Sequence, residues 1–194
     1  MFHHFTRMDS GSSDLPMTLY TIGHSNLNAE DFLARLQRHK ITTLVDVRSA
    51  PVSKYVPHFN KSVLESWLPD AGIIYRYAGK YLGGRTENPA YLSDGKPDYL
   101  KMMQRPKYVI GIVRLLNLVV QGAESGFIAV MCAENDALQC HRHHLIARSL
   151  IDPSVCVIEG GINLTLQHID ASGDLLPPLT PEDFSPPTIQ PSLL

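Results

Sequence analysis

The chain has 194 residues, of which 44% are hydrophobic and 19% charged, a composition typical of a soluble globular protein with one domain-sized core. Its formal net charge of −2 gives no electrostatic basis for broad binding to nucleic acid or a membrane surface. No apolar run approaches the ~20 residues that span a bilayer, and the first residues lack the apolar core of a signal peptide. The three cysteines are an odd number in a chain too long to need disulfide staples, so we expect a reducing, cytoplasmic location.

Composition also divides the chain into three parts. Residues 1–16 are polar and predict a loose leader. Residues 17–170 carry regular apolar patterning and predict one folded domain. Residues 171–194 are rich in proline and have no period, so we expect a tail that is extended or disordered from Leu175 onward.

The first half of the predicted domain alternates strand-like runs with helix signals. Residues 19–22, 41–47 and 73–77 are largely apolar or β-branched and predict strands. Asn28 is a good N-cap for a helix after the first strand, and residues 61–68 predict a second helix. Strands that alternate with helices favour a parallel sheet.

The second half begins with residues 79–99, which are rich in Gly, Pro and Asp and predict a long loop. Pro106 suits the first turn of a helix that runs to about Val120. The residues of this helix that we expect to contact the core are Ile110, Val113, Leu116 and Leu118. Residues 127–131 then predict a central strand that is buried on both faces.

The last part of the domain contains one helix and two strand candidates. The helix ends near Leu150, and its expected buried stripe consists of Leu138, Leu145, Ile146, Ser149 and Leu150. Strands are expected at 155–158 and 162–169, and Gly160-Gly161 between them suits a tight hairpin. The predicted fold class is therefore α/β, a single domain with a mainly parallel sheet of about five or six strands and helices on both faces.

Polar side chains follow three of the predicted strands. They are His24, Asp46, Arg48, Cys132 and Glu134. Cys140, His141 and Arg142 follow at the predicted start of the next helix. Parallel strands bring their carboxyl ends to one edge of a sheet, where α/β proteins bind ligands. We therefore expect the functional site at this edge.

Six short blocks of sequence give a resemblance to a known family. The blocks are TIGHSN at 21–26, DVR at 46–48, PHFN at 57–60, LGGR at 82–85, MCAE at 131–134 and CHR at 140–142. In this order they resemble the domain-of-unknown-function 488 family over roughly residues 18–169. The resemblance implies membership of that family and carries over no biochemical activity. DVR at a strand end also resembles rhodanese-type sulfurtransferases, although no compact cysteine-to-arginine loop follows Cys132.

Four residues near the central strand are candidate catalytic groups, namely Cys132, Glu134, Cys140 and His141. In the first turn of a helix, the macrodipole and the neighbouring Arg142 would stabilise Cys140 as a thiolate, which is the reactive form. Glu134 suits general acid–base catalysis, although a capping or ion-pair role explains it equally. Cys156 lies in an apolar run, and we expect it in the core.

A second set of residues is expected to bind the substrate. Arg48, Arg85 and Arg142 come from three separate loops, and guanidinium groups bind phosphate or carboxylate through paired hydrogen bonds. Any one of them alone is explained equally well by a structural ion pair. The full set is Gly23, His24, Ser25, Asn26, Asp46, Arg48, His58, Asn60, Gly83, Gly84, Arg85 and Arg142.

A metal site is an alternative for the same region. Cys132, Cys140 and His141 offer soft ligands, and His24 or His58 would complete a tetrahedron. However, the cysteines do not form a CxxC pair, and nearby arginines disfavour a cation. The prediction therefore assigns no metal ligand and names no cofactor.

These observations predict an enzyme that binds a small anionic ligand, phosphate- or nucleotide-like, and acts as a cysteine-dependent transferase or hydrolase. A non-catalytic ligand sensor that uses the same pocket is the second hypothesis. Nucleic-acid association is the third, and it is disfavoured by the near-neutral charge. Its candidate patch is Lys54, Lys61, Arg76, Lys80 and Arg85. The sequence does not specify the oligomeric state.

Overall fold

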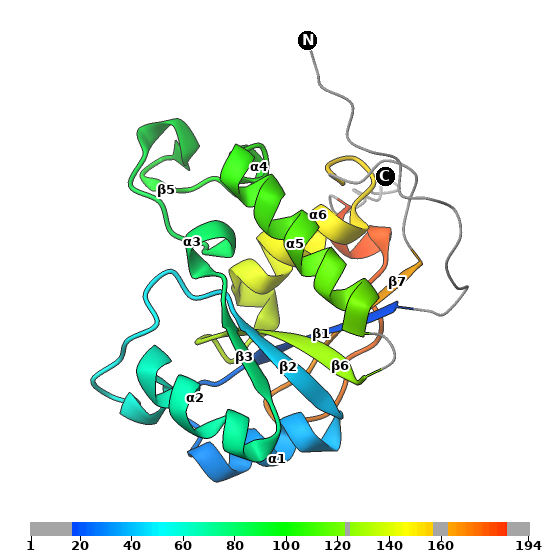
Figure 1. Ribbon diagram of the computed structural model, residues 1–194. Coiled ribbons are helices and arrows are strands. Elements are labelled where there is room, and N and C mark those ends of the chain that lie inside the picture. The colour runs from blue at the N-terminus through cyan, green and yellow to red at the C-terminus, as the bar shows by residue number, and fades with distance from the viewer. Residues whose placement is uncertain (1–16, 123–124, 157–162, 186–194) are drawn as a thin grey trace, which may run out of the picture.

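The centre of the molecule is a five-stranded parallel sheet (Figure 1). This computed structural model describes residues 17–122, 125–156 and 163–185. The strand order is β3-β2-β6-β1-β7. The strands are β1 (Met17–Gly23), β2 (Ile41–Asp46), β3 (Ile74–Tyr77), β6 (Phe127–Cys132) and β7 (Leu164–His168). The structure confirms the predicted α/β fold class.

Helices cover both faces of the sheet (Figure 1). Helices α1 (Ala29–Arg38) and α2 (Lys61–Trp67) lie on one face, and α5 (Pro106–Gly122) and α6 (Arg148–Ile151) lie on the other. No helix within the described ranges combines the length and the apolar character that crossing a bilayer requires.

Alternate side chains of the central strand enter two separate cores. Ile128, Val130 and Cys132 of β6 pack into the core beneath α5 and α6. Ala129 and Met131 pack into the core beneath α1 and α2. Successive residues of a strand point to opposite faces, so a sheet covered on both sides requires a continuous apolar run. Cys132 is therefore on the α5 side of the sheet.

Helix α1 begins at the predicted cap. Asn28 Oδ1 accepts a hydrogen bond of 2.7 Å from the backbone N–H of Asp31, which satisfies one of the free donors of the first turn. Phe32 and Leu36, four residues apart, are fully buried against the sheet.

Helix α5 has the predicted position, but its predicted core stripe is wrong for Ile110. That side chain is 44% exposed, Val113 and Leu118 are half-buried, and Leu116 is buried as predicted. The helix is apolar on more than one side, so its sequence is compatible with several buried faces. Packing against the rest of the protein determines which face is buried. The buried residues are Tyr108, Gly111, Ile112, Leu115, Leu116 and Val119.

The predicted loop 79–99 contains regular structure. Its elements are α3 (Gly79–Leu82), a 3₁₀ turn (Pro89–Tyr91), the antiparallel hairpin of β4 (Leu92–Ser93) and β5 (Lys96–Pro97), and the start of α4 (Tyr99–Met103). Asp94 and Gly95 both have positive φ and close the hairpin, as an Asp-Gly pair favours.

The helical segment before Leu150 is irregular. Residues Arg142–Ala147 form a π-helical turn, which continues into α6. Leu138, predicted to be buried, lies instead in the 3₁₀ turn Ala137–Gln139 and is 49% exposed. The other residues of the predicted stripe are buried, namely Leu145, Ile146, Ser149 and Leu150.

The two predicted C-terminal strands have different outcomes. Val155 and Cys156 lie in a loop, so the described part of the predicted strand 155–158 is not a strand. The predicted Gly160-Gly161 hairpin lies outside the described residues. The predicted strand 162–169 corresponds to β7, which pairs parallel to β1.

The chain after β7 turns back along that strand. The backbone N–H of Leu176 donates to His168 O, and that of Leu179 donates to Leu166 O, each over 2.9 Å. Phe184 is buried and stacks on the His143 ring, with centroids 4.7 Å apart. Packing against the core therefore extends beyond residue 170.

Candidate functional site

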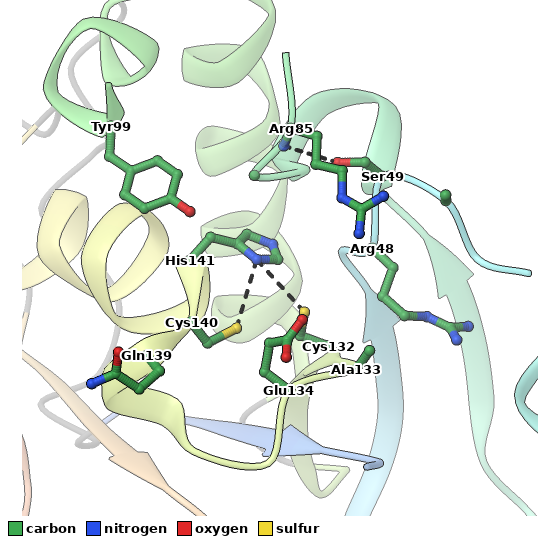
Figure 2. Close-up of a pocket in the computed structure, with 12 residues that line it drawn as sticks. Arg48, Ser49, Arg85, Tyr99, Cys132, Ala133, Glu134, Gln139, Cys140 and His141 are labelled. Atoms are coloured by element: carbon green, nitrogen blue, oxygen red, sulfur yellow. Dashed lines mark hydrogen bonds between the residues drawn. The ribbon is translucent and has the colours of Figure 1, made fainter. Parts of the chain in front are cut away.

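A pocket opens at the carboxyl edge of the sheet, where β2 and β6 end (Figure 2). Its volume is about 170 Å³, and it is lined by residues 48–50, 84–85, 99, 132–134 and 139–141. All four predicted catalytic residues line it, namely Cys132, Glu134, Cys140 and His141. They meet because β6 delivers the first two and the following turn delivers the others to the same edge.

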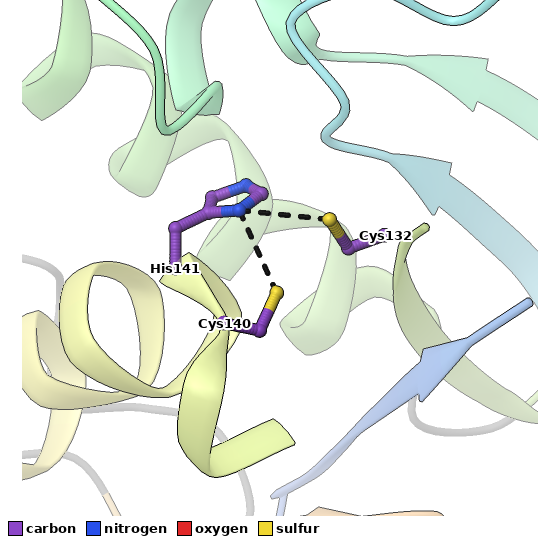
Figure 3. A group of neighbouring side chains, drawn as sticks. All are labelled: Cys132, Cys140 and His141. Atoms are coloured by element: carbon purple, nitrogen blue, oxygen red, sulfur yellow. Dashed lines mark hydrogen bonds between the residues drawn. The ribbon is translucent and has the colours of Figure 1, made fainter. Parts of the chain in front are cut away.

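Two thiols and one imidazole form the innermost part of the pocket (Figure 3). His141 Nδ1 lies 3.6 Å from Cys132 Sγ and 3.7 Å from Cys140 Sγ. The three atoms lie within 4.8 Å of one another, and all three residues are buried. We call Cys132, Cys140 and His141 the thiol–imidazole cluster.

The orientation of the His141 ring is fixed from two directions. Its Nε2 lies 3.3 Å from the carbonyl oxygen of Val47, which only accepts hydrogen bonds, so Nε2 carries a proton. Gly84 packs on the ring so closely that a Cβ there would lie 2.6 Å from His141 Cγ. The Nδ1 atom is thereby held toward the two sulfurs.

Arg142 supports the cluster from the protein interior. Its side chain is fully buried, and its Nε and backbone N each lie 3.4 Å from Cys140 Sγ. Its Nη2 donates to the carbonyl of Glu134 over 2.7 Å, which ties down the chain after β6. Arg142 has no carboxylate partner among the described residues, and its Nε–H contacts Cys140 Sγ, a group that can carry a balancing negative charge.

The surroundings of the cluster favour the thiolate form of Cys140 over that of Cys132. A hydrogen bond from the Cys132 thiol lowers the pKa of Cys140, and His141 and Arg142 lower it further. The same hydrogen bond and burial raise the pKa of Cys132. Cys140 lies just before the helix rather than in its first turn as predicted, and its carbonyl accepts from the N–H of His143.

Arg48 and Asp46 form a separate, saturated ion pair. Arg48 Nε and Nη2 donate to the two Asp46 carboxylate oxygens over 2.9 and 2.6 Å. Its Nη2 also donates to Phe59 O over 2.7 Å, and its Nη1 lies 3.0 Å from His24 Nε2. Although Arg48 lines the pocket, its guanidinium is turned away from the cluster in Figure 2.

His24 belongs to the same network on the α1 side of the sheet. Its ring stacks on Phe59 with centroids 4.2 Å apart. Burial lowers the pKa of His24 to about 4, and the adjacent Arg48 charge lowers it as well. The neutral ring therefore accepts from Arg48 and donates from Nδ1 to Ser25 O over 2.8 Å.

The pocket includes only part of the predicted binding set. Arg48, Gly84 and Arg85 line it. The other predicted residues do not, namely Gly23, His24, Ser25, Asn26, Asp46, His58, Asn60, Gly83 and Arg142. His58 Nε2 lies 2.7 Å from Leu27 O, and Asn60 Oδ1 accepts from Ser53 N over 2.6 Å, so both stabilise local chain geometry.

Three polar residues of the pocket were absent from the sequence-based set. They are Ser49, Tyr99 and Gln139. Ser49 directly follows the DVR block and Gln139 directly precedes Cys140, so proximity to those motifs was an available signal. Tyr99 had no such signal, because α4 brings it in from a segment predicted to be a loop. Burial raises the pKa of Tyr99, and nearby Cys140 and Cys132 contribute.

A buried histidine pair behind Arg142 makes stability depend on pH. His168 Nδ1 lies 2.7 Å from Thr21 Oγ1, and its Nε2 lies 3.1 Å from His143 Nδ1. Burial, followed by the charge of Arg142, lowers the pKa of His168 from 6.5 to about 3. In the unfolded chain His168 therefore binds a proton below pH 6.5, whereas in the folded chain it stays neutral down to about pH 3. The free energy of unfolding consequently falls as the pH falls through this window.

We expect His168→Gln, which stays neutral at every pH in this range, to flatten that dependence. About 3 kcal/mol of the wild-type loss in unfolding free energy between pH 7 and pH 4 should disappear in the variant. Urea unfolding at several pH values measures the difference. Parallel curves for the two proteins would contradict the assignment.

One protein family matches the chain. The sequence model of the family described as "Domain of unknown function DUF488" matches residues 28–149. The match begins at the N-cap of α1, ends in α6, and includes the thiol–imidazole cluster. Comparison with the curated proteins and with the solved structures gave no match. Because the match covers more than half of the chain, the protein belongs to the DUF488 family.

Proposed function

We propose that the chain is a cysteine-dependent enzyme, a transferase or hydrolase that acts on a small anionic substrate in this pocket. One observation carries the proposal: a buried thiol–imidazole cluster shares a pocket with the exposed side chain of Arg85. Enzymes combine reactive groups of this kind with a group that orients the substrate beside them.

Arg85 is the arginine best placed to bind an anion. The guanidinium groups of Arg48 and Arg142 are occupied by internal hydrogen bonds. The Arg85 guanidinium has no hydrogen-bond or ion-pair partner among the described residues, and its backbone N–H is anchored to Ser49 Oγ over 3.1 Å. A guanidinium at a pocket rim binds phosphate or carboxylate through charge-assisted hydrogen bonds.

The other pocket residues supply complementary groups. The exposed carboxylate of Glu134 is suited to proton transfer, and the cluster is suited to attack on the substrate or to its activation. The hydroxyl of Tyr99 points toward His141 in Figure 2 and offers a hydrogen-bond donor. Together these groups fit an acyl- or phosphoryl-group reaction better than simple ligand storage.

We expect Arg85→Gln to weaken binding of inorganic phosphate and of AMP by about tenfold to a hundredfold, which corresponds to a charge-assisted hydrogen bond of roughly 1.5–3 kcal/mol. Isothermal titration calorimetry measures the affinity. Arg76→Gln is the matched control, since Arg76 is also exposed but lies on β3 outside this pocket.

Equal affinities in the Arg85 and Arg76 variants would remove the anion site from this pocket. Turnover is tested on a panel of phosphate and carboxylate esters. The proposal requires a compound that the wild-type protein consumes and that Cys140→Ser does not. A panel on which the two proteins behave alike would contradict cysteine-dependent catalysis.

A further inference from the structure

We infer that Cys132, Cys140 and His141 bind one divalent metal ion, Zn²⁺ by ligand type, and leave its fourth coordination position open to the pocket. The inference deepens the proposed function, on which it rests for the ligand of the pocket, by assigning the chemistry of the cluster. It reverses the order of the sequence-based hypotheses, in which the thiol nucleophile stood ahead of a metal.

The spacing of the three ligand atoms is the first support. In a tetrahedral site with Zn–S of about 2.3 Å and Zn–N of about 2.0 Å, a sulfur and a nitrogen lie about 3.5 Å apart. His141 Nδ1 lies 3.6 Å from Cys132 Sγ and 3.7 Å from Cys140 Sγ. Both sulfur–nitrogen separations thus already match those that one central ion imposes, and the two sulfurs lie within 4.8 Å of each other.

The tautomer of His141 is the second support. Because Nε2 donates to Val47 O, the Nδ1 atom of the neutral ring has one lone pair, and it faces two sulfurs at almost equal distance. Without a metal ion, the proton of the Cys132 thiol can be donated to Cys140 Sγ or to His141 Nδ1, but not to both. A metal ion between the three atoms engages all of them at once.

The surroundings of the cluster match an outer coordination shell. Metal-bound histidines usually donate their second ring N–H to a carbonyl or carboxylate, as His141 does to Val47 O. Arg142 directs its Nε–H and its backbone N–H at Cys140 Sγ, which stabilises negative charge on a coordinating thiolate. Two thiolates would also balance the charge of the ion, so the centre would add no net positive charge beside the buried guanidinium.

Access to the sulfurs argues against a free nucleophile. Cys140 is 1% exposed and Cys132 is 5% exposed, whereas reactive cysteines are partly exposed. Metal ligands, in contrast, can be buried, because it is the open coordination position of the ion that contacts solvent or substrate. All three proposed ligands line the pocket, so we expect the open position to face it. His24 and His58, the fourth ligands considered from the sequence, instead contact Arg48 and Leu27 O.

The three-ligand set identifies the class of site. Structural zinc sites have four protein ligands, whereas catalytic sites have three and a water molecule or substrate in the fourth position. A bound Zn²⁺ would polarise a substrate oxygen or lower the pKa of its bound water. Arg85 would then hold the anionic group of the substrate, and Glu134 would be available for proton transfer.

Cobalt substitution of the full-length protein tests the inference. The protein is stripped of metal with a chelator under reducing conditions and titrated with Co²⁺. We expect one Co²⁺ per chain, a sulfur-to-cobalt charge-transfer band, and the intense visible bands of a tetrahedral ion. Cys140→Ser, Cys132→Ser and His141→Asn should each weaken Co²⁺ binding by more than about a hundredfold, since loss of outer-shell groups alone costs ten- to a hundredfold.

Matched controls are Cys156→Ser and His144→Asn, which change the same residue types outside the cluster and should keep the wild-type spectrum. Zn²⁺ should also protect Cys132 and Cys140 of the wild-type protein from iodoacetamide, a readout that needs no variant to fold. Absence of the charge-transfer band would overturn the inference. So would alkylation of Cys140 at the same rate, fast or slow, with and without Zn²⁺.

Anion binding is read separately on the same sample. Phosphate or AMP should alter the visible bands of the wild-type cobalt protein, and Arg85→Gln should keep the bands but lose this response. A cobalt spectrum that no anion alters would support the metal site and contradict the proposed substrate class. Phosphate binding that depends on Arg85, in a protein that gives no cobalt spectrum, would support the proposed substrate class and contradict the metal site.

Discussion

Replacement of Arg142 by Met should destabilise the protein by about 3–5 kcal/mol, because the change removes a fully buried charge that other buried groups depend on. The guanidinium donates to the carbonyl oxygens of Glu134 and Asn135 and to Cys140 Sγ. Met fills a similar volume but donates none of these bonds. A loss of this size is a large fraction of the total stability of a typical domain.

Urea unfolding of Arg142→Met against wild type measures this effect. Arg38→Met is the control, since Arg38 forms an exposed ion pair with Asp174 that should contribute less than about 1 kcal/mol. Arg142→Lys, which keeps the charge but not the planar fork, should fall between the two. An Arg142→Met variant as stable as Arg38→Met would show that the buried guanidinium does not support the loop after β6.

The second large effect is expected at Gly23, the last residue of β1. A Cβ at this position would lie 1.9 Å from the carbonyl oxygen of Glu134 and 3.0 Å from Arg142 Nη2. The backbone beyond it is tied to the same segment, since His24 N donates to Cys132 O over 3.0 Å. We expect Gly23→Ala to force the two backbones apart and to cost about 3 kcal/mol of stability.

Gly122→Ala is the matched control for this substitution. A Cβ at Gly122 would meet only the flexible end of Ile128 at 3.3 Å, so its effect should stay within about 1 kcal/mol. Urea unfolding compares the two variants. If Gly23→Ala were as stable as Gly122→Ala, the close approach of β1 to the chain after β6 would not be a constraint on this site.

The fold and the position of the pocket that the candidate catalytic residues line were predictable, because both depend on local sequence pattern. The apolar run 127–131 is a strand buried on both faces, and parallel pairing places its end beside the end of β2. Cys132, Cys140 and His141 therefore meet through sequence proximity to one strand end. No long-range detail was needed to place them at this edge of the sheet.

The state of each arginine was not predictable in the same way. Arg48 and Arg142 are saturated by carbonyl and carboxylate groups, whereas Arg85 is exposed. That difference depends on which backbone carbonyl groups point toward each guanidinium. The spacing of residues in the sequence does not reveal this. The ion pair between Arg48 and Asp46 could have been predicted, because side chains two residues apart on an extended backbone point to the same side.

The choice between a metal-binding and a nucleophilic role for Cys132 and Cys140 also required the distances from their sulfurs to His141. The sequence supplied two cysteines and a histidine but not the near-equal separations from His141 Nδ1. The absence of a CxxC pair argued against a metal, yet a strand end and a helix start bring the two sulfurs together without one. Tertiary geometry therefore changed the ranking of the two chemistries.

The most direct measurement is X-ray absorption spectroscopy at the zinc edge on the full-length protein reconstituted with Zn²⁺. A metal held by Cys132, Cys140 and His141 predicts two sulfur neighbours at about 2.3 Å and two nitrogen or oxygen neighbours at about 2.0 Å, one of them from solvent or substrate. Addition of phosphate should change the nitrogen and oxygen shell and leave the sulfur shell intact. A spectrum without sulfur neighbours would contradict the metal centre in this pocket.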